Sequence, residues 1–201
     1  MIAPLMRLLL ARHGETEANR HGAFLGRTDS PLTAGGRDQM QTLAKALVGK
    51  PLAAIYTSPL QRAFETAQTI ARHHPCPFTV DERLLEQDFG QWEGLTFDEV
   101  AGRFPIDFAA WQAEATIKGP TDGETLMQVR ERVVALYSDV VNRHQHQTVL
   151  LVAHGGVLNA LVCALLQTPL RWLWAYQFQP GSLSEVLVFE EGCALTRLNS
   201  V

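Results

Sequence analysis

Three short apolar runs, each followed at once by polar residues, constrain the fold of this chain more than any other sequence feature. The runs at residues 8–11, 55–56 and 149–153 are almost entirely apolar. Strands that helices cover on both faces have this composition. The sequence therefore predicts an α/β fold of three layers, with a mainly parallel central sheet flanked by helices. The expected strands span residues 5–11, 53–57, 78–80, 148–153, 186–189 and 194–198.

The segments between these strands carry apolar residues at helical spacing. In residues 123–143, apolar side chains recur every three or four positions, which places them on one face of a helix. Thr33 is a typical N-cap, and Gly49 and Pro51 end the helix that it begins. The expected helices span residues 33–48, 59–72, 123–143 and 157–166.

One segment between these elements is less regular. Residues 90–120 follow no single period and are rich in aromatic residues. Because no repeat, low-complexity tract or flexible linker divides the chain, we expect residues 1–201 to form a single domain, with a helical, lid-like insertion at about 90–120. Scattered aromatic side chains usually pack in a core, and Trp111 is our candidate for stacking on a base-like substrate.

Charge and hydropathy exclude several classes of function. The chain has 17 Lys and Arg against 21 Asp and Glu, a net charge of −4, so no general positive field exists to hold nucleic acid or an acidic membrane. No run reaches the ~20 apolar residues of a membrane helix. Pro4 and Arg7 interrupt the apolar residues 1–10, which indicates a first strand and not a signal peptide. We therefore expect a cytoplasmic protein.

Cysteines and histidine pairs do not suggest a metal site. Cys76, Cys163 and Cys193 are widely spaced and match no zinc-ligand pattern, so we expect reduced thiols, with Cys163 in the core. His73-His74 and His144-Gln-His146 each follow the end of an expected helix, where the helix dipole favours a cationic group. We expect these histidines to be exposed and assign no metal to them.

The polar clusters after the three apolar runs carry the chemistry that this sequence offers. Arg12 and His13 follow the first run, Arg62 comes shortly after the second, and His154 follows the third. Ligands of open parallel sheets bind at the carboxyl ends of the strands, where we expect these side chains to meet. Arginine offers a fork of donors that matches phosphate oxygens, and a neutral histidine is a nucleophile that can carry a phosphoryl group. The sequence therefore predicts a phosphoryl-transfer site built from fixed cations and helix N-termini.

The leaving group of such a reaction needs a proton, and two carboxylic acids are available to supply it. Glu86 and Asp88 both follow the expected strand at residues 78–80. A donor of this kind is typically a carboxylic acid that stays protonated near neutral pH. The residue pattern alone leaves both candidates open.

Four longer motifs surround these residues: Leu10-Ala-Arg-His-Gly-Glu-Thr16, Ser58-Pro-Leu-Gln-Arg-Ala-Phe-Glu-Thr-Ala67, Leu85-Glu-Gln-Asp-Phe-Gly-Gln-Trp-Glu-Gly94 and Val152-Ala-His-Gly-Gly156. In order and spacing they resemble the motifs of the histidine phosphatase superfamily, which has the phosphoglycerate-mutase-like fold. The resemblance covers nearly the whole chain, and four motifs together are far more specific than one Arg-His-Gly.

The resemblance implies a role for each matching residue. His13 is implied to be the nucleophile that forms a phosphohistidine, with Arg12, Arg62 and His154 binding the phosphoryl oxygens. Glu86 is implied to donate the proton to the leaving group.

Further binding positions are implied in the same way. Asn19 matches another phosphate-contacting position of the family, and Thr16 and the backbone of Gly155 are implied contributors to substrate binding. The family needs no metal or other cofactor, and the implied partner is a small-molecule phosphate ester. The sequence leaves the oligomeric state open, a homodimer included.

Within the superfamily, the chain is most similar to the alpha-ribazole phosphatase family, which dephosphorylates alpha-ribazole 5′-phosphate in cobalamin biosynthesis. The similar segments are Gly14-Glu-Thr-Glu-Ala-Asn19, Asp88-Phe-Gly90, Pro120-Thr-Asp-Gly-Glu124, Arg132-Val133 and Ala194-Leu-Thr-Arg-Leu-Asn-Ser200. Leu25 departs from the pattern, because several relatives carry a polar residue such as glutamine there. The resemblance thus implies a phosphomonoesterase with this substrate.

Three other functions stay open at this point. The resemblance also covers broad-specificity phosphatases and phosphoglycerate-type mutases. A mutase must hold a substrate carboxylate and retain a bisphosphorylated intermediate. Residues 87–153 form a segment that is short compared with that of the glycolytic mutases and has few cations. This favours hydrolysis by water over transfer within a mutase. A non-catalytic phosphate-binding module would not require a proton donor, so the complete set of residues argues against it.

Overall fold

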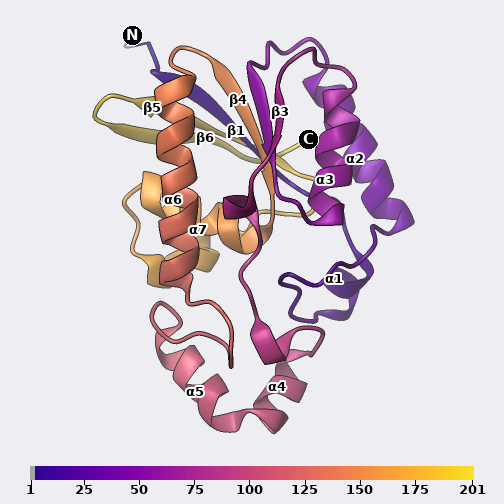
Figure 1. Cartoon of the computed structure of the whole chain (residues 1–201), viewed down its shortest axis with the longest axis vertical. Coiled ribbons are helices and arrows are strands. Elements are labelled where there is room, and N and C mark those ends of the chain that lie inside the picture. Colours follow the sequence, from indigo (N-terminus) through magenta and orange to yellow (C-terminus); the bar gives the residue numbers. More distant parts are fainter. Residues whose placement is uncertain (1–2) are drawn as a thin grey trace.

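The structure is a computed structural model that describes residues 3–201, and its centre is a six-stranded sheet (Figure 1). Residues 1 and 2, the start of the apolar N-terminal stretch, lie outside the described residues. The strands are β1 Met6–Arg12, β2 Ala54–Thr57, β3 Phe78–Val80, β4 Thr148–Ala153, β5 Leu183–Phe189 and β6 Gly192–Ser200. Their order is β3-β2-β4-β1-β5-β6, and the first four run parallel to one another. Only β5 and β6, at one edge, pair antiparallel, so the predicted mainly parallel sheet is confirmed.

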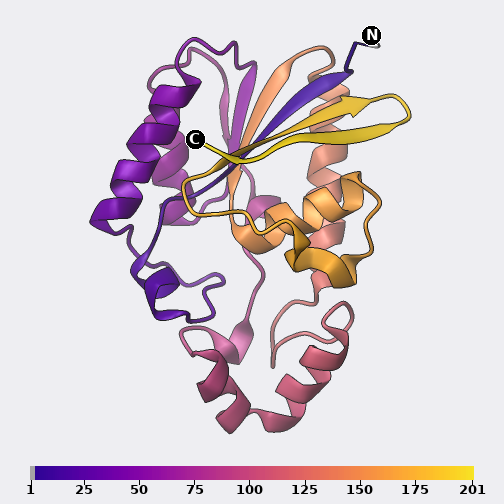
Figure 2. The same cartoon turned by 180° about the vertical axis from the view of Figure 1, so that it is seen from behind.

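Helices cover both faces of this sheet. Figures 1 and 2 show α2 (Ala34–Leu47) and α3 (Gln61–Ala71) on one side and α6 (Leu126–Arg143) and α7 (Gly155–Leu165) on the other. The remaining helices and 3-10 turns are α1 Glu17–His21, η1 Glu82–Leu84, η2 Gly90–Trp92, α4 Phe97–Arg103, α5 Pro105–Glu114 and η3 Leu170–Ala175.

Alternation along the strands divides their side chains between two cores. In β1, Leu8 and Leu10 pack in a cluster with α6 and α7, whereas Leu9 and Ala11 pack in a cluster with α2 and α3. Successive side chains of a strand point to opposite faces, so one unbroken apolar run fills both cores. This arrangement explains why the three apolar runs predicted a sheet covered on both faces.

The four predicted helices all form, with shifts of a few residues at their ends. The Oγ1 of Thr33 accepts the Gly36 N–H at 2.8 Å, which makes Thr33 the N-cap of α2 as predicted. Helix α6 begins at Leu126, later than the predicted start at residue 123, because Thr125 and Gln128 form a capping box there.

Residues 90–120 form η2, α4 and α5, which lie beyond the edge of the three layers (Figure 1). Their aromatic side chains, together with Phe24 and Phe89, make a third cluster, separate from the two sheet cores, and Trp92 is fully buried in it. Packing is therefore the main role of these aromatic residues, as predicted. The interpretation of this segment as a lid on a single domain stays a prediction. The cluster consists of Phe24, Phe89, Trp92, Val100, Phe108 and Trp111.

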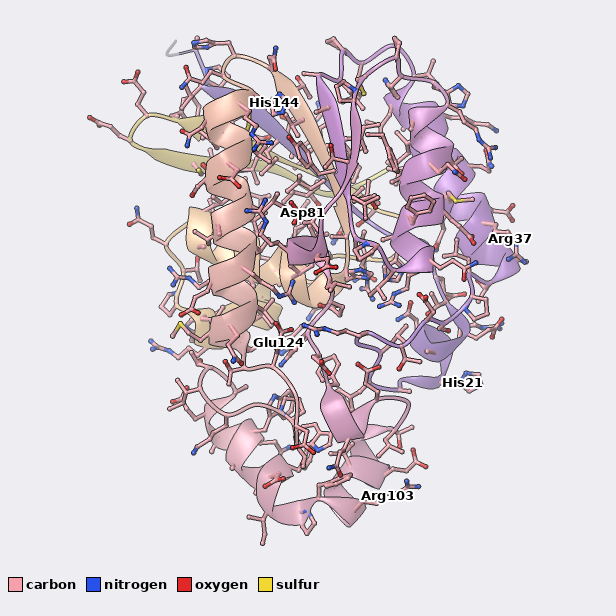
Figure 3. The ribbon with its side chains drawn as sticks, viewed as in Figure 1. His21, Arg37, Asp81, Arg103, Glu124 and His144 are labelled. Atoms are coloured by element: carbon pink, nitrogen blue, oxygen red, sulfur yellow. The ribbon has the colours of Figure 1, made fainter. Side chains whose placement is uncertain are left out.

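Two histidines differ from the expectation that they are exposed. That expectation is wrong for His74, which is 8% exposed: after α3 the chain keeps turning, with the His74 N–H donating to the Ala71 carbonyl at 3.0 Å. His144 is half-buried, because its Nε2 lies 3.0 Å from the hydroxyl of Tyr56. Figure 3 shows His144 at the far end of α6 from Glu124.

Two further features concern the chain as a whole. Cys163 is buried in α7 as predicted, and all three cysteines are free. Among the helices of residues 3–201, none combines the length and the apolar character that a bilayer-spanning segment needs.

Candidate functional site

Adjacent strands bring the two predicted histidines together at their carboxyl ends. β2, β4 and β1 are neighbours, and backbone hydrogen bonding continues past the end of each. The His13 N–H donates to the Ala153 carbonyl at 3.1 Å, and the Ser58 N–H donates to the Val152 carbonyl at 3.1 Å. As a result the ring centroids of His13 and His154 lie 5.0 Å apart, and both side chains are buried.

The backbone determines which nitrogen of His13 is available for reaction. Nδ1 lies 2.7 Å from the Gly14 carbonyl oxygen, which can only accept, so Nδ1 carries the proton and Nε2 keeps its lone pair. Burial holds the pKa of His13 well below its usual value, and the charges of Arg12 and Arg62 lower it further. The imidazole is therefore neutral at physiological pH, as a nucleophile must be.

His154 is oriented by a residue that the sequence analysis did not single out. Its Nε2 lies 2.8 Å from the hydroxyl of Ser58, which is fully buried. Its Nδ1 is buried and has no hydrogen-bond partner within residues 3–201. Burial, followed by the charge of Arg62, holds the pKa of His154 well below its usual value. The available signal was the position of Ser58 in the polar cluster directly after β2.

Backbone carbonyls hold both arginines and leave part of each guanidinium unoccupied. Arg62 donates from Nη1 to the Thr28 carbonyl at 3.0 Å and from Nη2 to the Gly26 carbonyl at 2.6 Å. Arg12 donates from Nη1 to the Phe178 carbonyl at 2.6 Å. In the described chain the Nε of each is buried without a partner, and burial lowers the pKa of both residues. Buried cationic donors without partners suit an anion such as phosphate.

Glu86 lies against the first turn of α7. Its Oε2 accepts the Gly156 N–H at 2.9 Å, and its Oε1 accepts the Val157 N–H at 3.0 Å. A Cβ at position 156 would lie 2.6 Å from Oε1, so this approach requires glycine there. These two N–H groups fix the position of the Glu86 carboxyl group at the start of α7.

Asp88, the other candidate proton donor, lies in different surroundings. Its Oδ1 accepts the Gly90 N–H at 2.8 Å, and its Oδ2 lies 3.3 Å from Nη1 of Arg27. Glu86 lines the cavity next to the histidines, whereas Asp88 does not.

A cavity of about 350 Å³ opens beside these residues. Arg12, Asn19, Glu86 and Gly155 line it, as does Leu25, and among the described residues Arg12 is the one cation in its wall. The other predicted residues, His13, Thr16, Arg62 and His154, are buried and do not line it. The rest of the wall is largely aromatic, with Phe24, Phe89, Phe97, Trp111, Trp174 and Phe178.

Two of the predicted binding residues act on each other. The Oγ1 of Thr16 accepts the Asn19 N–H at 3.3 Å, and the Oδ1 of Asn19 accepts the Thr16 N–H at 3.2 Å, which is a capping box for α1. Thr16 therefore holds Asn19 at the cavity, and its direct contact with a substrate stays a prediction. At Gly155, a Cβ would lie 3.3 Å from Cζ of Arg12, so glycine lets this guanidinium lie close to α7.

Arg132 holds the segment that carries Glu86, a role that the sequence did not indicate. From α6 it donates to the carbonyls of Leu85 at 2.6 Å and Glu86 at 3.1 Å, and its Nε donates to Oε1 of Glu124 at 3.0 Å. Although burial opposes it, the hydrogen bond and charge of Arg132 lower the pKa of Glu124. Figure 3 shows Glu124 at the end of α6 that faces the insertion. We call Arg132 and Glu124 the α6 clamp.

These groups define a class of protein. A neutral histidine with a free Nε2, a second buried histidine, two arginines and a carboxylic acid meet at the carboxyl ends of a parallel sheet. This is the equipment of an enzyme that transfers a phosphoryl group through histidine. No group of three or more His, Cys, Asp or Glu that could hold a metal occurs within residues 3–201.

Comparison with known proteins identifies the family. Residues 8–201 match the family model described as histidine phosphatase superfamily (branch 1), and the chain belongs to this family. It is 34% identical over 195 residues to phosphoserine phosphatase 1 of Hydrogenobacter thermophilus, covering 97% of this chain and 92% of the relative. It is 31% identical over 195 residues to the adenosylcobalamin/alpha-ribazole phosphatase of Escherichia coli, covering 97% and 96%.

A solved structure gives the same result for the fold. The alpha-ribazole phosphatase of Shigella flexneri superposes with a TM-score of 0.90 at 31% identity, covering 97% of this chain and 96% of that one. The phosphoglycerate-mutase-like fold expected from the sequence is confirmed. The chain is a phosphatase of the histidine phosphatase superfamily.

Proposed function

We propose that this phosphatase hydrolyses alpha-ribazole 5′-phosphate through a phosphohistidine on His13. In the first step Nε2 of His13 attacks phosphorus, the ester P–O bond breaks, and Glu86 gives its proton to the leaving alkoxide. In the second step water attacks phosphorus, its proton returns to Glu86, and the N–P bond breaks. The products are the free alcohol and inorganic phosphate, and His13 is regenerated.

The fixed cations stabilise the phosphoryl group in both steps. The transferring group spreads negative charge over three oxygens, and the unpartnered donors of Arg12 and Arg62 are already in place to meet it. His154 supplies a further ring nitrogen, and Asn19 and the backbone of Gly155 add contacts at the cavity.

The observation that carries the choice of substrate is the cavity wall. Aromatic side chains dominate it, and Arg12, its one cation among the described residues, is engaged with the phosphate in this proposal. A heteroaromatic leaving group suits such a wall. Phosphoserine, suggested by the name of the Hydrogenobacter relative, carries a carboxylate that would find no separate cation there. A phosphoglycerate-type mutase would need such a cation for the carboxylate of its substrate.

Phosphate release under steady-state conditions tests the substrate. We expect kcat/KM for alpha-ribazole 5′-phosphate to exceed that for O-phosphoserine and p-nitrophenyl phosphate by about a hundredfold or more, which corresponds to at least ~2.7 kcal/mol in the transition state. Chelator in all assays excludes a contribution from metal ions. Comparable constants for the three esters would instead indicate a broad-specificity phosphatase, and transfer of phosphate to an added alcohol in preference to water would indicate a mutase.

The covalent step is tested separately with His13→Ala. We expect this variant to lose activity by about four orders of magnitude or more, and rapid acid-free quenching of the wild type to trap a phosphoenzyme. His73→Ala, at an exposed histidine, is the control and is expected to retain full activity. A variant His13→Ala that keeps a tenth of the activity would rule out the phosphohistidine.

A further inference from the structure

A second cavity, of about 710 Å³, adjoins the one at the phosphoryl site. Phe97, Trp111 and Trp174 line both cavities, so the two spaces meet at these rings. Phe97 belongs to α4 and Trp111 to α5, both in the insertion, whereas Trp174 belongs to η3, which follows α7. The rings therefore approach the junction from two separate parts of the fold.

Much of this aromatic surface is exposed to solvent. Phe97 is 51% exposed and Trp174 is 52% exposed, while Trp111 is buried. The rings of Phe97 and Trp111 belong together, with centroids 6.2 Å apart, but Trp174 stacks on no other ring in the part of the chain that the structure describes. A ligand that covers these faces removes apolar area from water, which is favourable.

Two polar groups of residues that line the first cavity also lack partners within the described chain. Within the described chain, Nε1 of Trp111 and Oδ1 of Asn159 are buried without a hydrogen bond, and both residues line the first cavity. Buried polar groups are nearly always satisfied in folded proteins, so such groups beside a cavity point to a ligand with hydroxyl or ring-nitrogen atoms.

We propose that Trp174, on one side, and Phe97 and Trp111, on the other, form an aromatic slot that binds a planar heteroaromatic base joined to the phosphate through a sugar. The first cavity is at the small end of ligand pockets, so a base linked through a sugar extends past it to the junction. The inference rests on the proposed function, because the phosphate must be held by Arg12 and Arg62 for the base to reach the slot. The slot makes Trp174 a specificity-determining residue.

Two phosphate esters that differ only by the base test the slot. Adenosine 5′-monophosphate carries a planar base on the sugar, and ribose 5-phosphate carries none, so the ratio of their kcat/KM values isolates the contribution of the base. We expect the wild type to prefer the nucleotide by about tenfold or more, and Trp174→Ala to lower this ratio by about tenfold, the usual effect of removing an aromatic ring that stacks on a base.

Trp172→Ala is a matched control. Trp172 lies on the same η3 segment and is 59% exposed, yet it lines neither of the two cavities. We expect this variant to leave the ratio unchanged. Trp174→Phe retains a ring and is expected to keep the ratio within about threefold of the wild type.

The outcomes separate the slot from the proposed substrate. A wild type without base preference, a ratio unchanged in Trp174→Ala, or a ratio that falls as far in Trp174→Phe as in Trp174→Ala would each overturn the slot. A ratio that falls in Trp174→Ala while alpha-ribazole 5′-phosphate shows no advantage over p-nitrophenyl phosphate supports the slot and removes the proposed substrate. If Trp174→Ala keeps the preference for alpha-ribazole 5′-phosphate, the result supports the proposed substrate and overturns the slot.

Discussion

The side chains of this site carry positive charge that a bound anion would neutralise. His13 and His154 are neutral because burial and the neighbouring arginines disfavour their protonated forms. Arg12 and Arg62 keep unpartnered donors in the interior of residues 3–201. A phosphate ester brings the missing negative charge, so binding and charge compensation are the same event.

The two candidate proton donors can be separated by their dependence on the leaving group. With Glu86→Gln, we expect kcat for an aliphatic ester such as alpha-ribazole 5′-phosphate to fall by about a hundredfold or more, because the alkoxide leaves without a proton. For p-nitrophenyl phosphate, whose phenolate leaves readily, we expect a loss of about tenfold or less.

Asp88→Asn is the matched comparison for Glu86→Gln. Its side chain accepts a backbone N–H and faces Arg27, so we expect a change of about threefold or less for both esters. The reverse pattern, with the leaving-group dependence appearing in Asp88→Asn, would transfer the proton-donor role to Asp88.

Ser58 is expected to position His154. Ser58→Ala leaves both ring nitrogens of His154 without a protein partner, and we expect kcat/KM to fall by about tenfold through loss of orientation. Ser138→Ala, at an exposed serine whose hydroxyl bonds only within α6, is expected to have no effect on kcat/KM. Equal activities of the two variants would remove Ser58 from the site.

How far individual residues could be predicted depends on whether their signal is local. His13, Arg62 and His154 stand directly after or near strand ends in the sequence, and strand ends converge in a parallel sheet. Glu86 and Asp88 could not be separated, because their difference lies in the backbone of α7, about 70 residues further along the chain. The roles proposed for all of these residues stay predictions until the variants are measured.

Among the elements, α6 does more than cover the sheet, because the α6 clamp ties it to the strand-to-insertion segment. Arg132→Ala removes the donors to the Leu85 and Glu86 carbonyls. We expect kcat for aliphatic esters to fall by about tenfold or more with a smaller change in KM, and, as for Glu86→Gln, a weaker effect with p-nitrophenyl phosphate.

Two variants control for the loss of a positive charge on this helix. Arg130 is exposed on α6, and Arg130→Ala is expected to change neither constant. Arg132→Lys keeps the charge and one donor, so we expect it to recover part of the kcat. If Arg130→Ala and Arg132→Ala lowered kcat equally, the clamp would have no specific effect on Glu86.

Elements with a regular period were predictable from the sequence, and irregular ones were not. The unbroken apolar run of β1 and the apolar stripe of α6 reflect their contacts with the core directly. The short helices α1, α4 and α5 form around local caps and an aromatic cluster whose members are distant in sequence, such as Phe24 and Trp111. The caps are local, but no window of sequence contains the contacts of that cluster.

At the scale of the whole molecule, the buried histidines link stability to pH. The pKa values of His13 and His154 are lowered in the folded state, so below about pH 6.5 the unfolded chain binds more protons than the folded chain. Above about pH 6.5 these two histidines do not lower the free energy of unfolding. As the pH falls below this value, the free energy of unfolding decreases by up to about 1.4 kcal/mol per pH unit for each group. Urea denaturation at pH values between about 5 and 8 measures this slope.

His74 contributes to the pH dependence of stability in the same direction, because burial lowers its pKa too. The informative quantity is therefore the difference in slope between a His13 variant and the wild type. We expect His13→Asn to reduce the slope relative to the wild type, and inorganic phosphate to raise stability and flatten the slope, since its charge offsets the arginines. An identical slope in His13→Asn and wild type would show that His13 is not held neutral.

Some properties of the whole molecule stay predictions. The single domain with its lid and the cytoplasmic location are expectations from the sequence, which leaves the oligomeric state open, a homodimer included. The tests are limited proteolysis, fractionation and light scattering, in that order.

The separate aromatic cluster of the insertion has a consequence for how this enzyme can change over evolutionary time. It shares no buried member with the two clusters that face the sheet, so substitutions in it leave the sheet packing intact. Substitutions that change the choice of leaving group can therefore occur nearly independently of substitutions that change the phosphoryl chemistry. A lineage could exchange one substrate for another by accumulating mutations in residues 90–120 while Arg12, His13 and His154 stay the same.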